Sequence, residues 1–123
     1  MKKEVPWYRR VYSAYMRSST SRKTSFNLSE RQVADLIYGD CYYCGIAPNR
    51  MVVVKNGAFS TKKFFRHGID RLDSKRGYEL DNCVSCCTAC NRMKMDQTPE
   101  EFFGRVARIY HLHIAGDKNA NAG

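Results

Sequence analysis

The sequence lacks any long apolar run. A secretory signal needs an apolar region of about 7–15 residues, and a membrane-spanning helix needs about 20. The segment MKKEVPWYRRVYSAYM is instead interrupted throughout by basic and polar residues. The sequence therefore predicts no signal peptide, no contact with a membrane and a location in the cytoplasm, where thiols stay reduced.

Acidic side chains are also scarce. Among the 123 residues, 12 aspartates and glutamates oppose 21 lysines and arginines, which gives a formal net charge of +9. The imbalance is strongest in residues 1–31 and in residues 45–76, each with eight basic and two acidic side chains. Such a charge favours polyanionic partners, because phosphate contacts supply most of the sequence-independent affinity for nucleic acids. The simpler interpretation is a soluble protein with a basic, solvated face.

A thioredoxin-like βαβ pattern is missing around the six cysteines, which disfavours a redox function for their Cys-x-x-Cys spacings. Reduced cysteines at this spacing are typical zinc ligands, because one tight turn presents two thiolates to a tetrahedral ion. Cys41 and Cys44 form the first pair. The second pair is either Cys83–Cys86 or Cys87–Cys90, since both have the spacing.

We choose Cys87 and Cys90, because an Asn-x-x-Lys run follows Cys90. Cys83 and Cys86 are then expected to be buried free thiols. Four thiolates would close the zinc site and leave no open position for catalysis, so the zinc is structural and the chemistry must lie elsewhere. A structural zinc would also support a small core, because a chain of this size buries only about 65% of its unfolded surface.

Hydrophobic spacing and turn signals predict a mixture of helices and short strands. Apolar residues recur at helical spacing near both ends of the chain, whereas its middle is rich in β-branched residues and contains an Asn-Gly turn typical of a hairpin. The predicted architecture is therefore α+β. The expected elements, in order, are a helix over about 6–18, a helix capped by Ser29 and Gln32, strands over 51–55 and 58–65, a second hairpin from 68–72 and 78–85, and a helix near 87–90.

A last helix is expected to begin at Thr98, where a capping residue, a proline and a capping-box glutamate follow one another. Its apolar residues share one face, so we expect this helix to belong to the core. These residues are Phe102, Phe103, Val106, Ile109 and Tyr110. The chain then divides into a basic helix and loop over residues 1–26, the zinc-binding domain over residues 27–113 and a disordered tail over residues 114–123.

Polar side chains gather between the second hairpin and the helix after it. If that helix packs across the hairpin, Asp70 on the first strand and Asn91 on the helix can face each other. A carboxylate and an amide oxygen are suitable ligands for Mg²⁺ or Mn²⁺, and such a cation would neutralise charge at a scissile phosphate. Arg71 could bind a phosphate oxygen. A simpler interpretation is that Asp70, Arg71 and Asp73 only form a turn with surface ion pairs.

The segment from Gly68 to Lys94 combines an Ile-Asp-Arg-x-Asp core with Gly77-Tyr78, Asn82 and a Cys-x-x-Cys-Asn run, downstream of a Cys-Tyr-Tyr-Cys-Gly knuckle. Together these motifs resemble the HNH endonucleases, in particular the small phage and bacterial members. The similarity covers roughly residues 7–112. It implies a ββα-metal, treble-clef-like core that is braced by zinc, flanked by helices and cuts phosphodiester bonds with one divalent cation.

The resemblance implies roles for three residues. Asp70 matches the acid that binds the catalytic metal. Asn82 matches the middle asparagine, which holds the hairpin and the catalytic loop in shape. Asn91 matches the final residue of the motif, often histidine or asparagine, which completes the site for Mg²⁺ or Mn²⁺.

One position departs from the family pattern. The histidine that activates water should follow Asp70, but this chain has Arg71, which stays protonated and cannot act as a base. We favour Asp73 as the substitute, because a relative of the fold has its base three residues after the acid. His67 is nearer in chemistry, but its odd separation from Asp70 turns it to the opposite face of a shared strand. A chain without either base would depend on metal-activated water or would have lost catalysis.

Two functions follow from these observations. The first is a metal-dependent DNA endonuclease or nickase, and the second is a catalytically impaired, zinc-stabilised DNA-binding module with the same fold. A protein-interaction module is less favoured, because the basic charge clusters where phosphates would run. The expected partner is DNA, including double-stranded DNA, in a bacterial or phage-infected cell, with no obligate protein partner. The basic residues expected at DNA are Arg66, Lys62, Lys63, Lys75, Arg76, Arg92 and Lys94.

Overall fold

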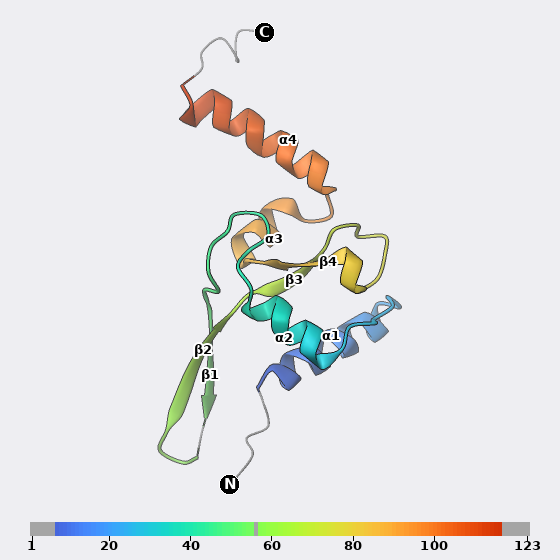
Figure 1. The fold of residues 1–123 in the computed structure, drawn as a ribbon, viewed down its shortest axis with the longest axis vertical. Coiled ribbons are helices and arrows are strands. Elements are labelled where there is room, and N and C mark those ends of the chain that lie inside the picture. The colour runs from blue at the N-terminus through green and yellow to red at the C-terminus, as the bar shows by residue number, and fades with distance from the viewer. Residues whose placement is uncertain (1–6, 56, 117–123) are drawn as a thin grey trace.

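The computed structural model describes residues 7–55 and 57–116, which form an α+β fold with two small antiparallel sheets (Figure 1). One sheet pairs β1 with β2, and the other pairs β3 with β4. The predicted α+β class is confirmed. The elements, in order, are α1 (Tyr8–Ser21), α2 (Glu30–Tyr38), β1 (Arg50–Lys55), β2 (Thr61–Arg66), β3 (Gly68–Arg71), the 3-10 turn η1 (Leu80–Asn82), β4 (Cys83–Cys86), α3 (Thr88–Lys94), α4 (Pro99–Ile109) and the π-helical η2 (Tyr110–Ile114).

The two N-terminal helices enclose the main hydrophobic core. Val11 of α1, Val33 and Ile37 of α2 and Ile69 of β3 are buried in one cluster, which places the start of the ββα unit directly on these helices. The predicted capping box at the start of α2 is confirmed, since the Ser29 side chain accepts from the backbone of Gln32 and the Gln32 side chain accepts from the backbone of Ser29. The first predicted helix begins two residues later than expected, and residue 6 lies outside the described residues.

The first predicted hairpin is confirmed, although its second strand begins at Thr61 and not at residue 58. Strands β1 and β2 pair in register from Arg50 opposite Arg66 to Lys55 opposite Thr61. Gly57 in the connecting turn has a φ of 90°, a backbone conformation that glycine adopts without steric cost, whereas Asn56 lies outside the described residues. The hairpin extends away from the helices (Figure 1).

The second hairpin is shorter than predicted. Strand β3 pairs with β4 alone, and Asp70 lies opposite Val84. The expected strand over 78–85 is wrong in its first half, because the buried Asn82 side chain binds the backbone of the preceding loop and the chain turns through η1 before β4 begins. Helix α3 follows β4 directly and completes a ββα unit.

Helix α4 begins where the sequence predicts, with a capping box between Thr98 and Glu101. The expectation that α4 belongs to the core is wrong. Phe102 is buried, but Val106 and Ile109 are 42% and 50% exposed, and the helix projects away from the rest of the molecule (Figure 1). Hydrophobic periodicity identifies an apolar face but not the surface that covers it.

The segment after α4 continues as η2 to Ile114, so helical structure reaches the first residue of the predicted tail. Residues 117–123 of that tail lie outside the described residues. Within residues 7–55 and 57–116, no helix combines the length and the apolar character that crossing a membrane requires.

Candidate active site and metal centre

The four cysteines selected from the sequence come together. The Sγ atoms of Cys41, Cys44, Cys87 and Cys90 all lie within 4.8 Å of one another, and those of Cys44 and Cys87 are 3.8 Å apart. A tetrahedral zinc ion with Zn–S bonds of about 2.3 Å would separate its sulfur ligands by ~3.8 Å. The cluster therefore has the composition and size of a site for a structural metal such as zinc.

Backbone amides prepare the cluster for a metal. The Cys87 amide donates to Cys41 Sγ at 3.3 Å, and the Cys90 amide donates to Cys87 Sγ at 3.4 Å. Burial raises the pKa of the Cys41 thiol, but hydrogen bonds from the backbone of Cys87, Cys44 and Tyr43 outweigh it and lower this pKa to about 6. Since the thiolate is the metal ligand, the knuckle favours metal binding near neutral pH.

The remaining two cysteines are buried free thiols, as expected. Burial raises the pKa of Cys83 to about 11. Burial, followed by the charge of Asp70, raises the pKa of Cys86 above its ordinary value. Both side chains therefore remain protonated at neutral pH and behave as small apolar residues.

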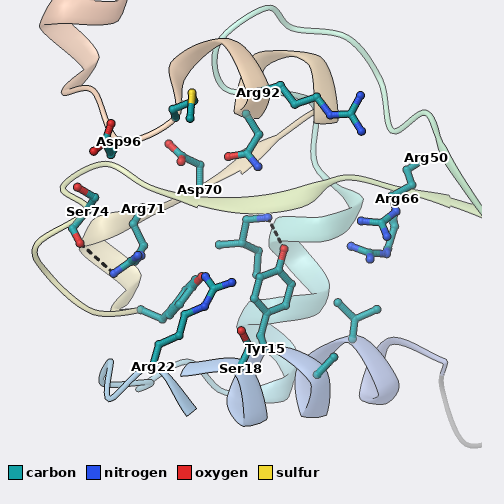
Figure 2. Close-up of a pocket in the computed structure, with 16 residues that line it drawn as sticks. Tyr15, Ser18, Arg22, Arg50, Arg66, Asp70, Arg71, Ser74, Arg92 and Asp96 are labelled. Carbon is teal, nitrogen blue, oxygen red and sulfur yellow. Dashed lines mark hydrogen bonds between the residues drawn. The ribbon is translucent and has the colours of Figure 1, made fainter. Parts of the chain in front are cut away.

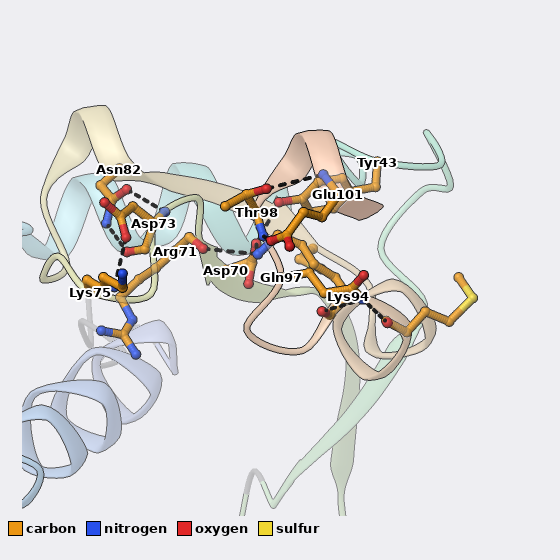
Figure 3. Close-up of polar contacts among 12 residues, drawn as sticks. Tyr43, Asp70, Arg71, Asp73, Lys75, Asn82, Lys94, Gln97, Thr98 and Glu101 are labelled. Carbon is orange, nitrogen blue, oxygen red and sulfur yellow. Dashed lines mark hydrogen bonds and ion pairs between the residues drawn. The ribbon is translucent and has the colours of Figure 1, made fainter. Parts of the chain in front are cut away.

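The carboxylate of Asp70 is held from one side (Figure 3). Its Oδ2 atom accepts a hydrogen bond from the Tyr43 hydroxyl at 2.6 Å and forms an ion pair with Lys94 Nζ at 3.1 Å. Tyr43 comes from the first cysteine knuckle, and Lys94 comes from the end of α3. Lys94 also donates to the Arg71 carbonyl at 3.3 Å. These contacts fix the carboxylate and leave Oδ1 without a hydrogen bond to any residue that the structure describes.

The contacts around Asp70 depend on one another. Burial, followed by the hydrogen bond to Asp70, raises the pKa of Tyr43 far above its ordinary value, so this hydroxyl keeps its proton and donates. Lys94 is fully buried and Asp70 is 6% exposed. Each buried charge is therefore compensated by the opposite charge of its partner. Removing one partner of such a pair costs about 3–5 kcal/mol, because the other is left as an uncompensated buried charge.

Asn82 braces the loop that follows β3 (Figure 3). Its Oδ1 atom accepts from the Asp73 amide at 2.9 Å, and its Nδ2 atom donates to the carbonyls of Asp73 and Gly77, both at 3.0 Å. The side chain is 1% exposed. Asn82 therefore connects the two ends of the loop, which is the geometry that the family resemblance implies for this residue.

A cleft of about 840 Å³ opens between α1 and the ββα unit (Figure 2). Asp70 and Asn91, the two oxygen ligands expected from the sequence, both line it. Tyr15 reaches into the cleft from α1, and its hydroxyl accepts a hydrogen bond from the Ile69 amide at 3.0 Å. A carboxylate and an amide in an open cleft suit a divalent cation that retains water or phosphate oxygens as further ligands.

The walls of the cleft are rich in guanidinium groups. Arg50 and Arg66 lie at the paired ends of β1 and β2, and burial, followed by the charge of Arg50, lowers the pKa of Arg66. Arg71 donates to the carbonyls of Ser74 and Arg76, so it also holds the loop. Like charges this close are compensated best by an anion such as phosphate. The arginines that line the cleft are Arg22, Arg50, Arg66, Arg71 and Arg92.

Neither candidate for the missing base is among the described residues that line the cleft. His67 is 1% exposed, and its Nε2 atom lies 2.8 Å from the Ile46 carbonyl, to which it donates. The Asp73 carboxylate accepts from the Lys75 amide at 2.9 Å and closes a turn. Burial contradicts the expectation that His67 faces the reacting phosphate, whereas Asp73 is exposed and its role as the base stays a prediction.

The basic residues expected at DNA fall into separate groups. The expectation that Lys94 binds DNA is wrong, because Lys94 is buried against Asp70 and cannot reach a phosphate. Arg76 forms an ion pair with Asp81 at 2.9 Å. Two expected residues, Arg66 and Arg92, line the cleft. The others lie exposed on β2 and on the loop after β3, and are Lys62, Lys63 and Lys75.

Sequence reasoning missed several residues of the site. Tyr43 could have been found, because it is an aromatic residue inside the metal knuckle. The position of Lys94 also had a signal, since it follows Cys90 by four residues and therefore lies on the same side of α3 as a metal ligand. Tyr15 and Arg22 had none, because only the packing of α1 against β3 brings them to the cleft.

Comparisons with known proteins give distant relatives. No family model matches the chain. The chain is 30% identical over 91 residues to uncharacterised protein R423 of Acanthamoeba polyphaga mimivirus, a match that covers 74% of this chain and 14% of that protein. It is 26% identical over 69 residues to YoqL, a candidate HNH endonuclease derived from the SPbeta prophage of Bacillus subtilis (strain 168), covering 56% of this chain and 29% of YoqL. The chain thus spans less than a third of the length of these curated relatives.

Among solved structures, the chain is similar to the rare-cutting HNH restriction endonuclease PacI, whose mechanism is described as one of DNA perturbation. The TM-score is 0.60, and the match covers 90% of this chain and 84% of that chain at 17% sequence identity. Similarity at this level of identity establishes the arrangement of the backbone and leaves the activity to be argued from the side chains.

Proposed function

We propose that this chain, whose fold is that of the HNH endonucleases, is a metal-dependent endonuclease that hydrolyses phosphodiester bonds in DNA. The resemblance seen in the sequence is confirmed for the fold, and the activity rests on the site. The observation that carries the proposal is the position of Asp70 and Asn91 in one arginine-lined cleft. Tyr43 and Lys94 bind a single oxygen of Asp70, which leaves the other available for a cation.

In this proposal, Asp70 and Asn91 would hold Mg²⁺ or Mn²⁺. The bound cation would neutralise the charge that develops at the scissile phosphate and stabilise the leaving oxygen. The cleft arginines bind the neighbouring phosphates and orient the strand for attack. Asp96 is a second carboxylate that lines the cleft, and we assign it as the group that accepts a proton from the attacking water, since neither His67 nor Asp73 is among the described residues that line the cleft.

Cleavage of supercoiled plasmid tests this function. The zinc-loaded protein is incubated with Mg²⁺, with Mn²⁺ or without added divalent cation, and its zinc content is measured in each sample. We expect nicked or linear plasmid only in the presence of the added cation. A folded, zinc-loaded protein that retards DNA but cuts under none of these conditions would refute the endonuclease and leave a DNA-binding module.

The hydroxyl of Tyr43 provides a more specific prediction. A Tyr43→Phe protein should keep its zinc and its fold, lose about 1.5–3 kcal/mol of stability with the hydrogen bond to a buried charge, and cut DNA about 10–100-fold more slowly, because contacts to a ligating carboxylate support its affinity and orientation. The measurement is the nicking rate over a range of Mg²⁺ concentrations. Tyr42→Phe is the matched control, since Tyr42 lies in the same knuckle and is 56% exposed. Equal rates for the two variants would contradict the role of Tyr43.

A further inference from the structure

The β1–β2 hairpin has one covered face and one open face. Val52, Val54 and Phe64 pack against the main core. On the opposite face, Met51 pairs with Phe65, and these side chains are 53% and 51% exposed. Large apolar side chains held in the open on an ordered strand pair are typical of an interaction surface.

The open face also carries positive charge. Val53 lies opposite Lys63, and Lys55 lies opposite Thr61, so two lysines lie beside the apolar residues of this face. Residues 50–66 contain no acidic side chain. At the end of the hairpin, the side chain of Phe59 is completely exposed. A basic surface without acids fits a polyanion better than it fits a second copy of this basic chain.

The hairpin is continuous with the candidate active site. Arg50 and Arg66 form the pair at its base, and both line the cleft that contains Asp70. Figure 2 shows these two arginines at the edge of the cleft, where the strands leave the body of the protein. A DNA strand with a phosphate at Asp70 would therefore pass the base of the hairpin, and the neighbouring base pairs would lie along its length.

We propose that the β1–β2 hairpin enters the major groove of double-stranded DNA beside the cleavage site, an inference that rests on the proposed function for its substrate. A major groove about 12 Å wide admits a two-stranded ribbon, whereas a minor groove about 6 Å wide does not. Strands of six residues extend for ~20 Å, or about 6 base pairs. Lys55 and Lys63 contact phosphates or guanine acceptors, and Met51 and Phe65 contact thymine methyl groups.

The test measures binding to short duplexes without divalent cation, so that its outcome does not depend on cleavage. One duplex is unmodified, and a matched duplex carries a bulky substituent on cytosine C5, which projects into the major groove. We expect the substituent to weaken binding at least tenfold, and a ligand that fills the A·T minor groove to change it less than twofold. The reverse pattern, or equal affinity for single strands, would overturn the proposal.

A Lys63→Ala/Phe65→Ala protein identifies the hairpin as the origin of the effect. Both side chains are exposed on β2, so the fold should be retained, which circular dichroism checks. We expect at least tenfold weaker duplex binding, a salt slope reduced by about 1 and no remaining sensitivity to the cytosine substituent. Arg108→Ala is the matched control, because Arg108 is an exposed basic residue on α4, at the other end of the molecule (Figure 1).

Three outcomes separate this inference from the proposed function. If the double variant binds duplex DNA like the wild type, the hairpin proposal fails while plasmid cleavage can still hold. If the wild type shows major-groove binding but cuts no plasmid, the endonuclease fails and the hairpin proposal stands. If the double substitution instead dissociates a dimer in sedimentation experiments, the open face of the hairpin is a protein interface and the proposal is wrong.

Discussion

An Asp70→Asn protein is expected to lose plasmid cleavage and, at the same time, a large part of its stability. The loss of cleavage should be about 10³-fold or more, because the proposed cation loses its anionic ligand. The loss of stability has a separate cause: Lys94 is fully buried, and Asp70 is its ion-pair partner at 3.1 Å. An unpaired buried charge costs about 3–5 kcal/mol. Nicking rates and urea unfolding measure the two effects independently.

The Asp70→Asn/Lys94→Met protein separates catalysis from folding. It removes both charges and replaces the lysine by an apolar side chain of similar length, which is often neutral for stability. The new amide oxygen can still accept the hydrogen bond of Tyr43. We expect the free energy of unfolding to recover to within about 1–2 kcal/mol of the wild type while cleavage remains absent. Cleavage by the double variant would show that Asp70 is not a ligand, and a fully stable single variant would contradict the buried ion pair.

The sequence predicted the metal centre because its constraint is local. Each Cys-x-x-Cys turn brings two thiolates together regardless of the rest of the fold, and the Asn-x-x-Lys run after Cys90 correctly selected the downstream pair, which the structure places with Cys41 and Cys44. The same holds for the capping boxes at Ser29 and Thr98, whose partners lie three residues away. Such features depend on spacing alone.

The environment of Asp70 could not be predicted, because it depends on contacts between distant segments. Tyr43 and Lys94 are 27 and 24 positions away from Asp70 in the sequence. The sequence alone therefore did not distinguish Lys94 from the other basic residues. For His67 the sequence gave part of the answer. Its odd separation from Asp70 argued against a shared face, but its contact with the Ile46 carbonyl, 21 residues away, could not be predicted.

Helix α4 shows a different limit. Its amphipathic pattern is strong and its bounds follow from the capping box, yet only Phe102 of its described residues is buried. Periodicity shows that a helix has an apolar face, whereas burial depends on which surface the chain brings to it. The prediction of the second hairpin was wrong at a turn. A loop replaces the strand expected from residue 78, because the Asn82 side chain donates to the carbonyls of Asp73 and Gly77.

Loss of the metal from the cysteine cluster should have the largest effect on folding. Zinc contributes roughly 10–16 kcal/mol of apparent folding free energy in small domains, which is as large as the whole stability of a typical domain, about 5–15 kcal/mol. A Cys90→Ser protein is therefore expected to bind less than one zinc per chain and to lose its cooperative unfolding transition. Because the same metal would fix the Cys41–Cys44 knuckle, which carries Tyr43 and its contact to Asp70, any residual folded protein should cut DNA more slowly.

Cys83→Ala is the matched control for this prediction. Cys83 is buried like Cys90, at 6% and 3% exposed, but it lies outside the four-thiol cluster and packs in the main core. Removing its sulfur should cost about 1–2 kcal/mol and leave one zinc per chain. Metal content by elemental analysis and unfolding by near-ultraviolet circular dichroism compare the two proteins. Equal zinc loss in both, or full zinc retention in Cys90→Ser, would contradict the ligand set, because a closed tetrahedral site requires each of its four thiolates and no other.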